Sequence, residues 1–248
     1  EKQFTALVQK LKIVFNDKFF DKKRGVYFDG IGTDHASLHA NMFPAAFGLT
    51  PEKYIPKVNS FIQSRGLACS VYGSQFLMDA VYEGGNGEYG LELLGSTAER
   101  SWYNMIRVGS TISLEAWDNK YKPNQDWNHA WGAAPANIIP RKLMGIEPLE
   151  PGFRKIQIKP QPGNLASAEM KCPTIQGDVL LSFANKPQQS FSLKLTIPAN
   201  TTANVYLPFW SKSQKVSMNG EPVKFRQEGS FAIIENVGSG NSAIEVLK

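Results

Sequence analysis

Residues 102–135 carry the densest set of side chains that could act on a sugar. Four of the five tryptophans lie there with three carboxylates and a histidine: Trp102, Glu115, Trp117, Asp118, Asp126, Trp127, His129 and Trp131. Aromatic faces stack on the apolar faces of sugar rings, and carboxylates bind hydroxyls or move protons. Core tryptophans beside a surface glutamate would produce the same pattern, so both interpretations stay open from composition alone.

Within this segment, Glu115 and Trp117 have the most informative spacing. They are two positions apart in the extended run Ser113-Leu-Glu-Ala-Trp117. Alternate side chains of an extended chain point to the same side. We therefore expect Glu115 and Trp117 to face one cavity.

A second pair with suggestive spacing is His35 and His39, which are four residues apart. They would share one face of a helix, as zinc ligands do, but the glutamate of a His-Glu-x-x-His motif is missing and no third ligand is evident. We expect packing or hydrogen-bonding roles for both and no metal. Neither a phosphate-binding glycine loop after a strand nor a Gly-x-Ser-x-Gly elbow occurs, and no cofactor is expected.

The composition excludes several classes of protein. The chain has 248 residues, 27 Lys plus Arg, 22 Asp plus Glu, and 42% hydrophobic residues, which is typical of a globular protein. No apolar run approaches the ~18 residues of a membrane span. No run of five or six basic residues occurs, so we do not expect nucleic-acid binding.

The periodicity of apolar residues changes once along the chain. It is helical as far as about Ile146 and alternates with period two after Pro148. Helices are predicted at 4–19, 35–47, 50–65, 74–82, 89–106 and 131–144, and strands at 155–159, 178–183, 190–197, 203–207, 215–218, 230–234 and 243–247. Asn219-Gly220 is typical of a hairpin turn. We predict a helical domain over residues 1–148 and an antiparallel β-sandwich over residues 149–248.

Four segments, in this order, resemble the C-terminal portion of the inverting alpha-L-rhamnosidases of glycoside hydrolase family 78. They are Gly109-Ser-Thr-Ile-Ser-Leu-Glu-Ala-Trp-Asp118, Asp126-Trp-Asn-His-Ala-Trp-Gly-Ala-Ala134, Leu143-Met-Gly-Ile-Glu-Pro-Leu-Glu-Pro-Gly-Phe153 and Ile156-Gln-Ile-Lys-Pro160. The resemblance implies the later helices of an (α/α)6 barrel followed by the family's C-terminal β-sandwich.

The resemblance also implies roles for individual residues. Glu115 matches the general base that activates water, and His129 matches a histidine that contacts the bound sugar. The substrate-binding residues expected with them are Trp102, Trp117, Asp118 and Trp131. Many family members carry Trp before the base and Arg after it, whereas this chain has Leu114 and Ala116. We therefore expect the edge of the cavity to differ.

The family's general acid lies N-terminal of the base, in helices that these residues do not contain. An inverting hydrolase needs two carboxyls, about 6.5–9.5 Å apart, and no second carboxyl here has a matching motif. We expect a fragment with the base but without the acid, inactive alone. Its open barrel edge should pair with a second copy or leave a broad apolar groove. The expected ligand is a rhamnose-containing carbohydrate, and the family suggests a periplasmic or secreted protein.

Two alternatives come from other classes. A carbohydrate-binding or structural module would favour a tryptophan-lined face on the sandwich, where only Trp210 lies. A different (α/α)6-barrel glycosidase or a phosphorylase would place a basic cluster beside Glu115, for which Lys120 and Lys122 are candidates.

Overall fold

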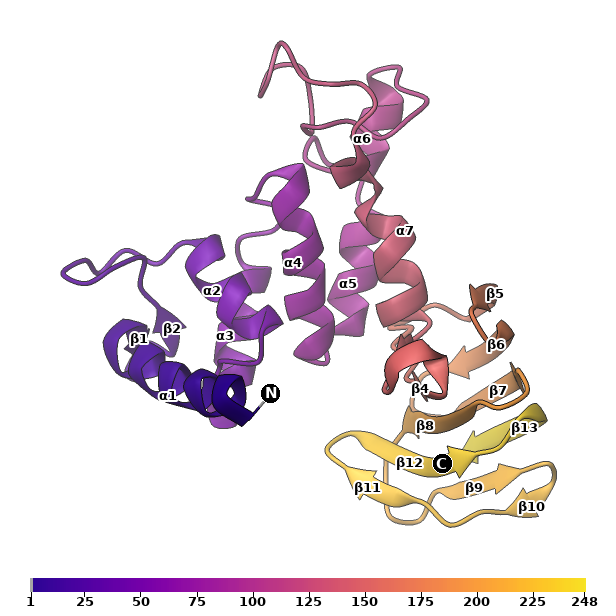
Figure 1. Cartoon of the computed structure of the whole chain (residues 1–248). Coiled ribbons are helices and arrows are strands. Elements are labelled where there is room, and N and C mark those ends of the chain that lie inside the picture. Colours follow the sequence, from indigo (N-terminus) through magenta and orange to yellow (C-terminus); the bar gives the residue numbers. More distant parts are fainter. Residues whose placement is uncertain (1) are drawn as a thin grey trace. The chain divides into compact units, whose positions relative to one another are not determined.

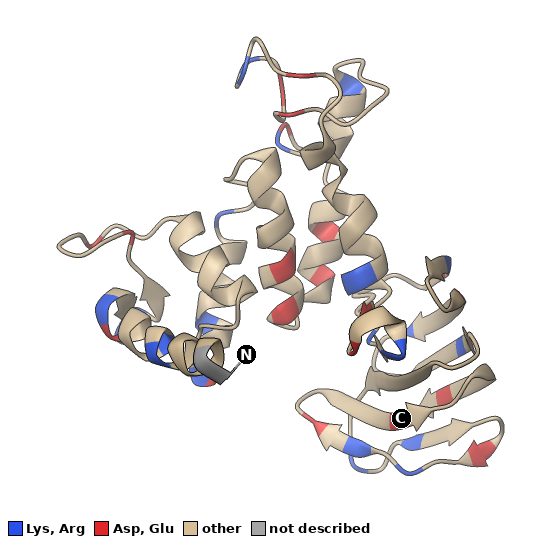
Figure 2. Ribbon diagram, in the orientation of Figure 1, with Lys and Arg blue, Asp and Glu red and all other residues tan. Residues whose placement is uncertain are grey.

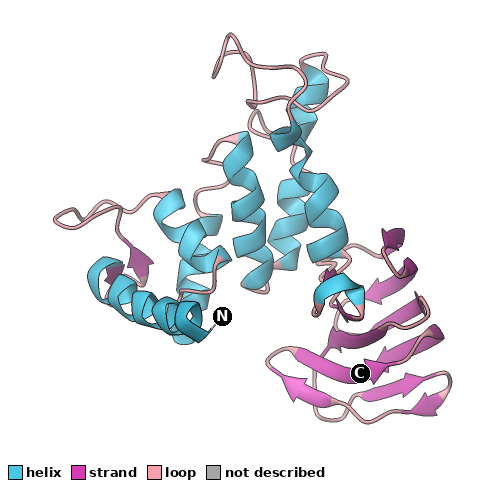
Figure 3. Cartoon of the chain, in the orientation of Figure 1, coloured by secondary structure: helices cyan, strands magenta, loops and turns pink. Residues whose placement is uncertain are grey.

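The computed structural model describes residues 2–248 and divides the chain into two compact units, Glu1–Pro135 and Ala136–Lys248. The first is helical and the second is built from strands (Figures 1 and 3). The predicted order of a helical region followed by a β region is confirmed.

Four helices of the first unit begin where the sequence supplies a capping side chain. The side chains of Ser37, Ser70 and Ser101 accept backbone N–H groups at the starts of α2, α4 and α6, and Asn86 does so at α5. The helices are α1 (Lys2–Phe19), α2 (Leu38–Ala46), α3 (Ile55–Gln63), α4 (Val71–Glu83), α5 (Gly87–Leu94) and α6 (Trp102–Arg107), with α7 (Ala134–Ile138) crossing into the second unit. A short hairpin pairs β1 (Phe20–Asp21) with β2 (Val26–Tyr27), and 3-10 turns occupy Glu52–Tyr54 and Ala130–Ala133.

The prediction of a single helix over residues 89–106 is wrong, because this segment contains two helices. α5 ends at Gly95 and α6 begins after Ser101. Glycine ends a helix readily, and the Ser101 hydroxyl accepts the N–H of Asn104 at 3.1 Å, which starts a new helix. The intervening loop carries Glu99 and Arg100.

The outward side of α1 is apolar. Phe4, Leu7, Val8 and Leu11 are exposed. Near the C-terminal end of α1, Phe15 packs against Tyr27 with ring centroids 5.5 Å apart. A groove of about 400 Å³, formed with Leu49, follows this helix.

The second unit holds two sheets. The first has the order β10-β9-β13-β7-β6-β5 and the second β11-β12-β8-β4-β3. A π-helical turn (Ile139–Leu143) precedes the strands, and a 3-10 turn (Pro151–Phe153) lies between β3 and β4. The bounds of the strands are β3 (Ile146–Pro148), β4 (Lys155–Ile158), β5 (Ser167–Thr174), β6 (Gly177–Lys186), β7 (Ser190–Ile197), β8 (Thr202–Pro208), β9 (Lys215–Met218), β10 (Glu221–Pro222), β11 (Arg226–Glu228), β12 (Phe231–Val237) and β13 (Gly240–Leu247).

Alternating burial along the strands forms the core of this unit. One side of β6 and β7 buries Leu181, Phe183, Leu193 and Leu195, and β8 buries Val205 and Leu207. The Asn219-Gly220 hairpin is confirmed: both residues have positive φ, and Met218 pairs with Glu221. The sandwich is not wholly antiparallel, however, because β4 pairs in parallel with β8.

The contacts divide the chain at 135, earlier than the change of periodicity at 148. A network of charges explains why the later helical turns belong with the strands. Glu147, in β3, forms ion pairs with Arg141 at 2.9 Å and with the buried Lys142 at 3.0 Å. Both cations lie in the Ile139–Leu143 turn, so this turn is attached to the sheet.

Candidate active site

Glu115 lies in the loop between α6 and the Ala130–Ala133 turn, where two stretches of the loop run side by side. The backbone N–H of Glu115 donates to the carbonyl of Asp126 at 3.1 Å, and that of His129 donates to the carbonyl of Ser113 at 3.0 Å. The Ser113 hydroxyl adds a bond to the His129 carbonyl at 2.8 Å. These bonds bring Glu115 and His129 onto neighbouring strands of one loop.

Gly132 allows the chain to pass close behind this loop. A Cβ at Gly132 would lie 2.5 Å from the Leu114 carbonyl oxygen and 2.6 Å from the Ser113 Cβ. Any larger residue would therefore push against the backbone that precedes Glu115. The fully buried Leu114 side chain anchors the same stretch.

The Glu115 carboxylate is held by two donors. The Lys122 ammonium donates to Oε1, and the Asp126 N–H donates to Oε2 at 3.1 Å. Both donors hold the pKa of Glu115 below its usual range, because both stabilise the charged form. Lys122 has the larger effect and the Asp126 N–H the smaller one. The Glu115 side chain is 14% exposed. Glu115 is therefore an ionised carboxylate with limited access to water.

Glu115 faces a cavity of about 420 Å³ in the helical unit. Its lining residues come from α2, the start of α4 and the loops on either side of α6: His39, Ala68, Cys69, Ser70, Val71, Arg100, Glu115, Ala116, Trp117, Tyr121, Lys122 and Trp131. The volume falls in the range of small-ligand sites. Of the predicted site residues, the cavity brings together Glu115, Trp117 and Trp131.

The two tryptophans of the cavity differ in what they offer a ligand. Trp131 is 45% exposed, and its ring contacts those of His129 and Tyr72 at centroid distances of 4.2 and 4.7 Å. Trp117 is 3% exposed and donates its indole N–H to the Cys69 carbonyl at 2.8 Å. Trp131 thus presents an exposed aromatic surface to a ligand, whereas Trp117 lines the cavity with a side chain that is almost fully buried.

Trp102, Asp118 and His129 do not line the cavity but support residues that do. Trp102 packs edge-on against Trp117 with centroids 5.3 Å apart and donates to the Gly132 carbonyl. Asp118 accepts a hydrogen bond from Asn104 at 3.1 Å, and the Lys120 N–H, followed by the Asn104 amide, lowers the pKa of Asp118. His129 Nδ1 accepts the Trp131 N–H at 3.3 Å, which leaves Nε2 to carry the proton of the neutral ring.

Sequence reasoning did not single out Arg100 or Tyr121, and it assigned His39 no contact with the site. Arg100 lies in the loop that replaces the middle of the predicted 89–106 helix, so no periodicity could have indicated it. His35, the partner of His39 in the sequence, instead hydrogen-bonds to Asp29. Among residues 2–248, no group of three or more His, Cys, Asp and Glu side chains could hold a metal ion.

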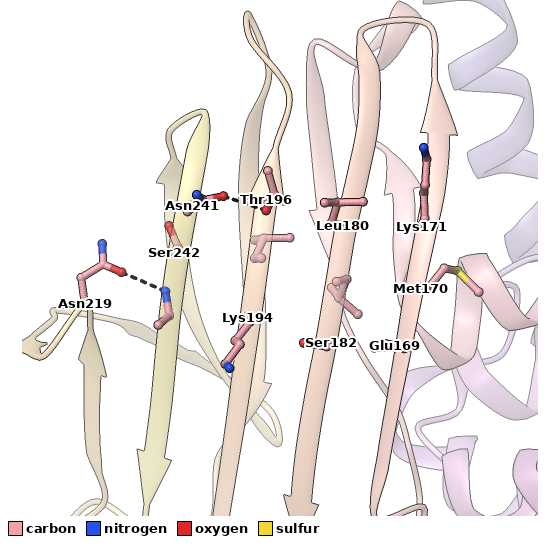
Figure 4. A pocket seen from close by; sticks show the side chains of 13 residues that line it. Glu169, Met170, Lys171, Leu180, Ser182, Lys194, Thr196, Asn219, Asn241 and Ser242 are labelled. Atoms are coloured by element: carbon pink, nitrogen blue, oxygen red, sulfur yellow. Dashed lines mark hydrogen bonds between the residues drawn. The ribbon is translucent and has the colours of Figure 1, made fainter.

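A larger hollow lies on the open face of the six-stranded sheet (Figure 4). It has a volume of about 690 Å³ and is lined by small, aliphatic and polar side chains such as Leu180, Ser182, Lys194 and Asn241. No aromatic ring is among its lining residues. It therefore lacks the stacking surface that Trp131 provides in the helical unit.

Comparison with known proteins gives a consistent family. Residues 1–143 match the bacterial alpha-L-rhamnosidase 6 hairpin glycosidase domain, and residues 145–221 match the bacterial alpha-L-rhamnosidase C-terminal domain. An alpha-L-rhamnosidase of Alteromonas sp. (strain LOR) is 28% identical over 240 residues, 90% of this chain and 25% of the relative. One of Formosa agariphila is 27% identical over 244 residues, 94% of this chain and 26% of the relative.

Solved structures show the same fold. The alpha-L-rhamnosidase of Dictyoglumus thermophilum superposes with a TM-score of 0.81 at 23% identity, covering 100% of this chain and 29% of that one. The Streptomyces avermitilis enzyme, complexed with L-rhamnose, gives 0.77 at 23% identity, covering 98% and 24%. The chain spans about a quarter of the length of the curated relatives named above. No helix among the described residues is long and apolar enough to cross a membrane.

Proposed function

We propose, since this chain belongs to the bacterial alpha-L-rhamnosidase family, that it supplies the general base to an enzyme that hydrolyses terminal alpha-L-rhamnose from glycans or glycosides with inversion. The family resemblance drawn from the sequence is confirmed. The base we propose is Glu115. We further propose a periplasmic or secreted enzyme, as the family suggests.

One observation carries the assignment of Glu115. Among the described residues that line the 420 Å³ cavity, it is the only carboxylate, and it lies there with the exposed Trp131. A base must be ionised before the reaction, and the lowered pKa of Glu115 meets that requirement at neutral pH. The two donors leave other lone pairs of the carboxylate available to a water molecule.

The proposed step is a single displacement. Glu115 takes a proton from a water molecule, whose oxygen bonds to the anomeric carbon on the face opposite the leaving group. The bond from that carbon to the glycosidic oxygen breaks, and a general acid protonates the departing oxygen. Trp131 stacks on the apolar face of the rhamnose, and His129, whose ring packs against that of Trp131, positions it. Trp117, Trp102 and Asp118 hold these groups in place.

None of the residues 2–248 supplies a second carboxylate to the lining of this cavity, so we propose that the acid comes from residues outside this sequence. The isolated 248-residue chain should then release no nitrophenol from a nitrophenyl rhamnoside. Release at a rate near that of a complete family enzyme would place the acid within these residues and overturn this part of the proposal.

The test of the base is Glu115→Gln in the protein that carries this chain. The amide matches the carboxylate in shape but cannot take the proton, and a proton transfer typically contributes about 10²–10⁴-fold. We expect turnover of the nitrophenyl rhamnoside to fall by at least two orders of magnitude with little change in Tm. Glu221→Gln is the matched control, since Glu221 is an exposed residue of β10 and does not line the cavity. A fully active Glu115→Gln enzyme would exclude Glu115 as the general base. Inversion is tested separately, by using NMR to identify which anomer of rhamnose is released first.

A further inference from the structure

Gln125 is a buried polar residue of the loop that carries Glu115, and the proposed step does not use it. Gln125 is 7% exposed. Its side-chain carbonyl accepts the Ala116 N–H at 2.9 Å, and its amide group donates to Asn119 Oδ1 at 2.8 Å. Buried polar groups are costly unless they are hydrogen-bonded, so these two bonds hold the amide in one orientation. Gln125 therefore ties the residue that follows Glu115 to Asn119, three residues before Lys122.

The backbone of Gln125 also fixes the position of Lys122. The Gln125 N–H donates to the Lys122 carbonyl at 3.1 Å. Pro123 and Asn124 lie between them, and proline at the second position is typical of such a four-residue turn. The Lys122 ammonium donates in turn to Glu115 Oε1. Because a lysine carries its charge on a flexible four-carbon stem, this ion pair depends on where the Lys122 backbone is held.

The second donor to the Glu115 carboxylate is the neighbour of Gln125. The Asp126 N–H belongs to the peptide group that follows Gln125, and it donates to Glu115 Oε2 at 3.1 Å. A rotation of the Gln125 backbone would turn this N–H away from the carboxylate. Figure 2 shows acidic and basic segments together in the loops around α6. Within this charged region, the placement of both donors to Glu115 depends on one buried neutral residue.

We propose that Gln125 is a positioning residue for the base, because its amide and its backbone together hold Lys122 and the Asp126 N–H against the Glu115 carboxylate. The inference rests on the proposed function, since it takes Glu115 to be the base, and it deepens that function by naming what sets the proton affinity of the base. Other titratable or charged groups around Glu115 are His39, Cys69, Arg100, Tyr121 and His129. Among residues 2–248, none of these five hydrogen-bonds to the Gln125 side chain.

The test is Gln125→Met in the protein that carries this chain, because methionine has a similar length but cannot replace the hydrogen bonds of the amide. Lys122 and the Asp126 N–H should then stabilise the Glu115 carboxylate less, so the pKa of Glu115 should rise. This pKa is measured by NMR of carboxyl-labelled glutamate, with the Glu115 signal identified by its absence in Glu115→Gln. We expect a smaller rise than in Lys122→Met, and a weaker effect of Gln125→Met once Lys122 has been replaced. The acidic limb of the kcat/KM profile should move to higher pH with the pKa.

Gln214→Met is the matched control. Gln214 is 6% exposed and makes similar bonds in a loop of the other unit, where its side chain accepts the Trp210 N–H at 2.7 Å and donates to the Pro208 carbonyl at 3.1 Å. Both substitutions should lower Tm, but Gln214→Met should leave the pKa of Glu115 in place. An unchanged pKa in Gln125→Met, or an equal rise in Gln214→Met, would show that Gln125 has only a structural role.

Asn119→Ala decides the question if Gln125→Met does not fold. Asn119 is exposed, and the substitution removes the partner of the Gln125 amide group while Gln125 itself is kept. The pKa of Glu115 should again rise, and in that case no rise would overturn the proposal. Because the NMR titration measures no turnover, its outcome is separate from that of the hydrolysis assay. An active Glu115→Gln enzyme removes Glu115 as the base, whereas an unmoved pKa removes the role of Gln125.

Discussion

Lys122 donates from its ammonium to Glu115 Oε1, within the loop that carries both residues. The pair has a defined electrostatic effect. Lys122 is the largest contributor to the lowered pKa of Glu115. A base held in this way stays ionised at lower pH but is a weaker proton acceptor.

Replacing Lys122 should therefore move the pH dependence of the enzyme. In Lys122→Met the pKa of Glu115 rises, because the charged form loses its main stabilising partner. Activity of a general base is lost as pH falls through its pKa, so the acidic limb of the kcat/KM profile should move to higher pH. Lys120→Met is the control, since Lys120 pairs with Glu99 instead. An acidic limb that stays in place would show that Lys122 does not govern the base.

Gly132→Ala should disturb the backbone that presents Glu115. The new Cβ would overlap the Leu114 carbonyl oxygen and the Ser113 Cβ. Such overpacking typically costs about 1–3 kcal/mol. We expect a lower Tm together with reduced turnover, measured by thermal unfolding and rhamnoside hydrolysis. Gly30→Ala is the matched control, because nothing lies within 4 Å of its added Cβ. Equal effects of the two substitutions would contradict the close approach.

Trp131→Ala should weaken substrate binding. Aromatic stacking contributes ~0.5–1.5 kcal/mol, so KM should rise by up to about tenfold while the lowered pKa of Glu115 is retained. Trp127 is similarly exposed, at 42% against 45%, but does not line the cavity. Trp127→Ala should leave KM unchanged. If KM rises in Trp127→Ala and not in Trp131→Ala, the sugar does not stack on Trp131.

The apolar side of α1 should cause self-association of the isolated chain. Phe4, Leu7, Val8 and Leu11 are all exposed on this helix. Sedimentation velocity should detect dimers whose proportion increases with concentration, and Leu11→Lys should reduce it. Ile175→Lys alters a single exposed apolar residue of the other unit and serves as the control. A strictly monomeric chain at high concentration would contradict this expectation.

The helical and β regions could be predicted from the sequence because burial imposes different periods on the two kinds of element. The Asn219-Gly220 turn was predictable for a local reason as well, since both residues tolerate positive φ. Edge strand β5 was not, because Ser167–Thr174 is half exposed along its length and contains Pro173. Pairing with β6 makes it a strand, and that interaction is tertiary.

The candidate site was predictable only in part, for a related reason. Glu115 and Trp117 both line the cavity, as their spacing predicted, but the chain bends over residues 115–118 and Ala116 lines the cavity as well. Arg100 and His39 reach that cavity from a separate loop and from α2. Their positions depend on how helices pack, which leaves no short spacing to recognise. Gly95 at the end of α5 and Ser101 at the start of α6 explain the break between these helices. The break was not predicted because the apolar residues on either side of it have helical periodicity.

The hydrogen bond from the Trp117 indole to the Cys69 carbonyl has a dynamic consequence. Cys69 directly precedes Ser70, whose side chain caps α4, and Tyr72 in the first turn of α4 packs against Trp131. The segment from Glu115 to Trp131 and the start of α4 are thus joined by two contacts, one at Trp117 and one at Trp131. We expect local opening of the two segments to be coupled. A ligand that orders the loop should therefore slow amide hydrogen exchange in the first turn of α4, even where it touches none of those amides.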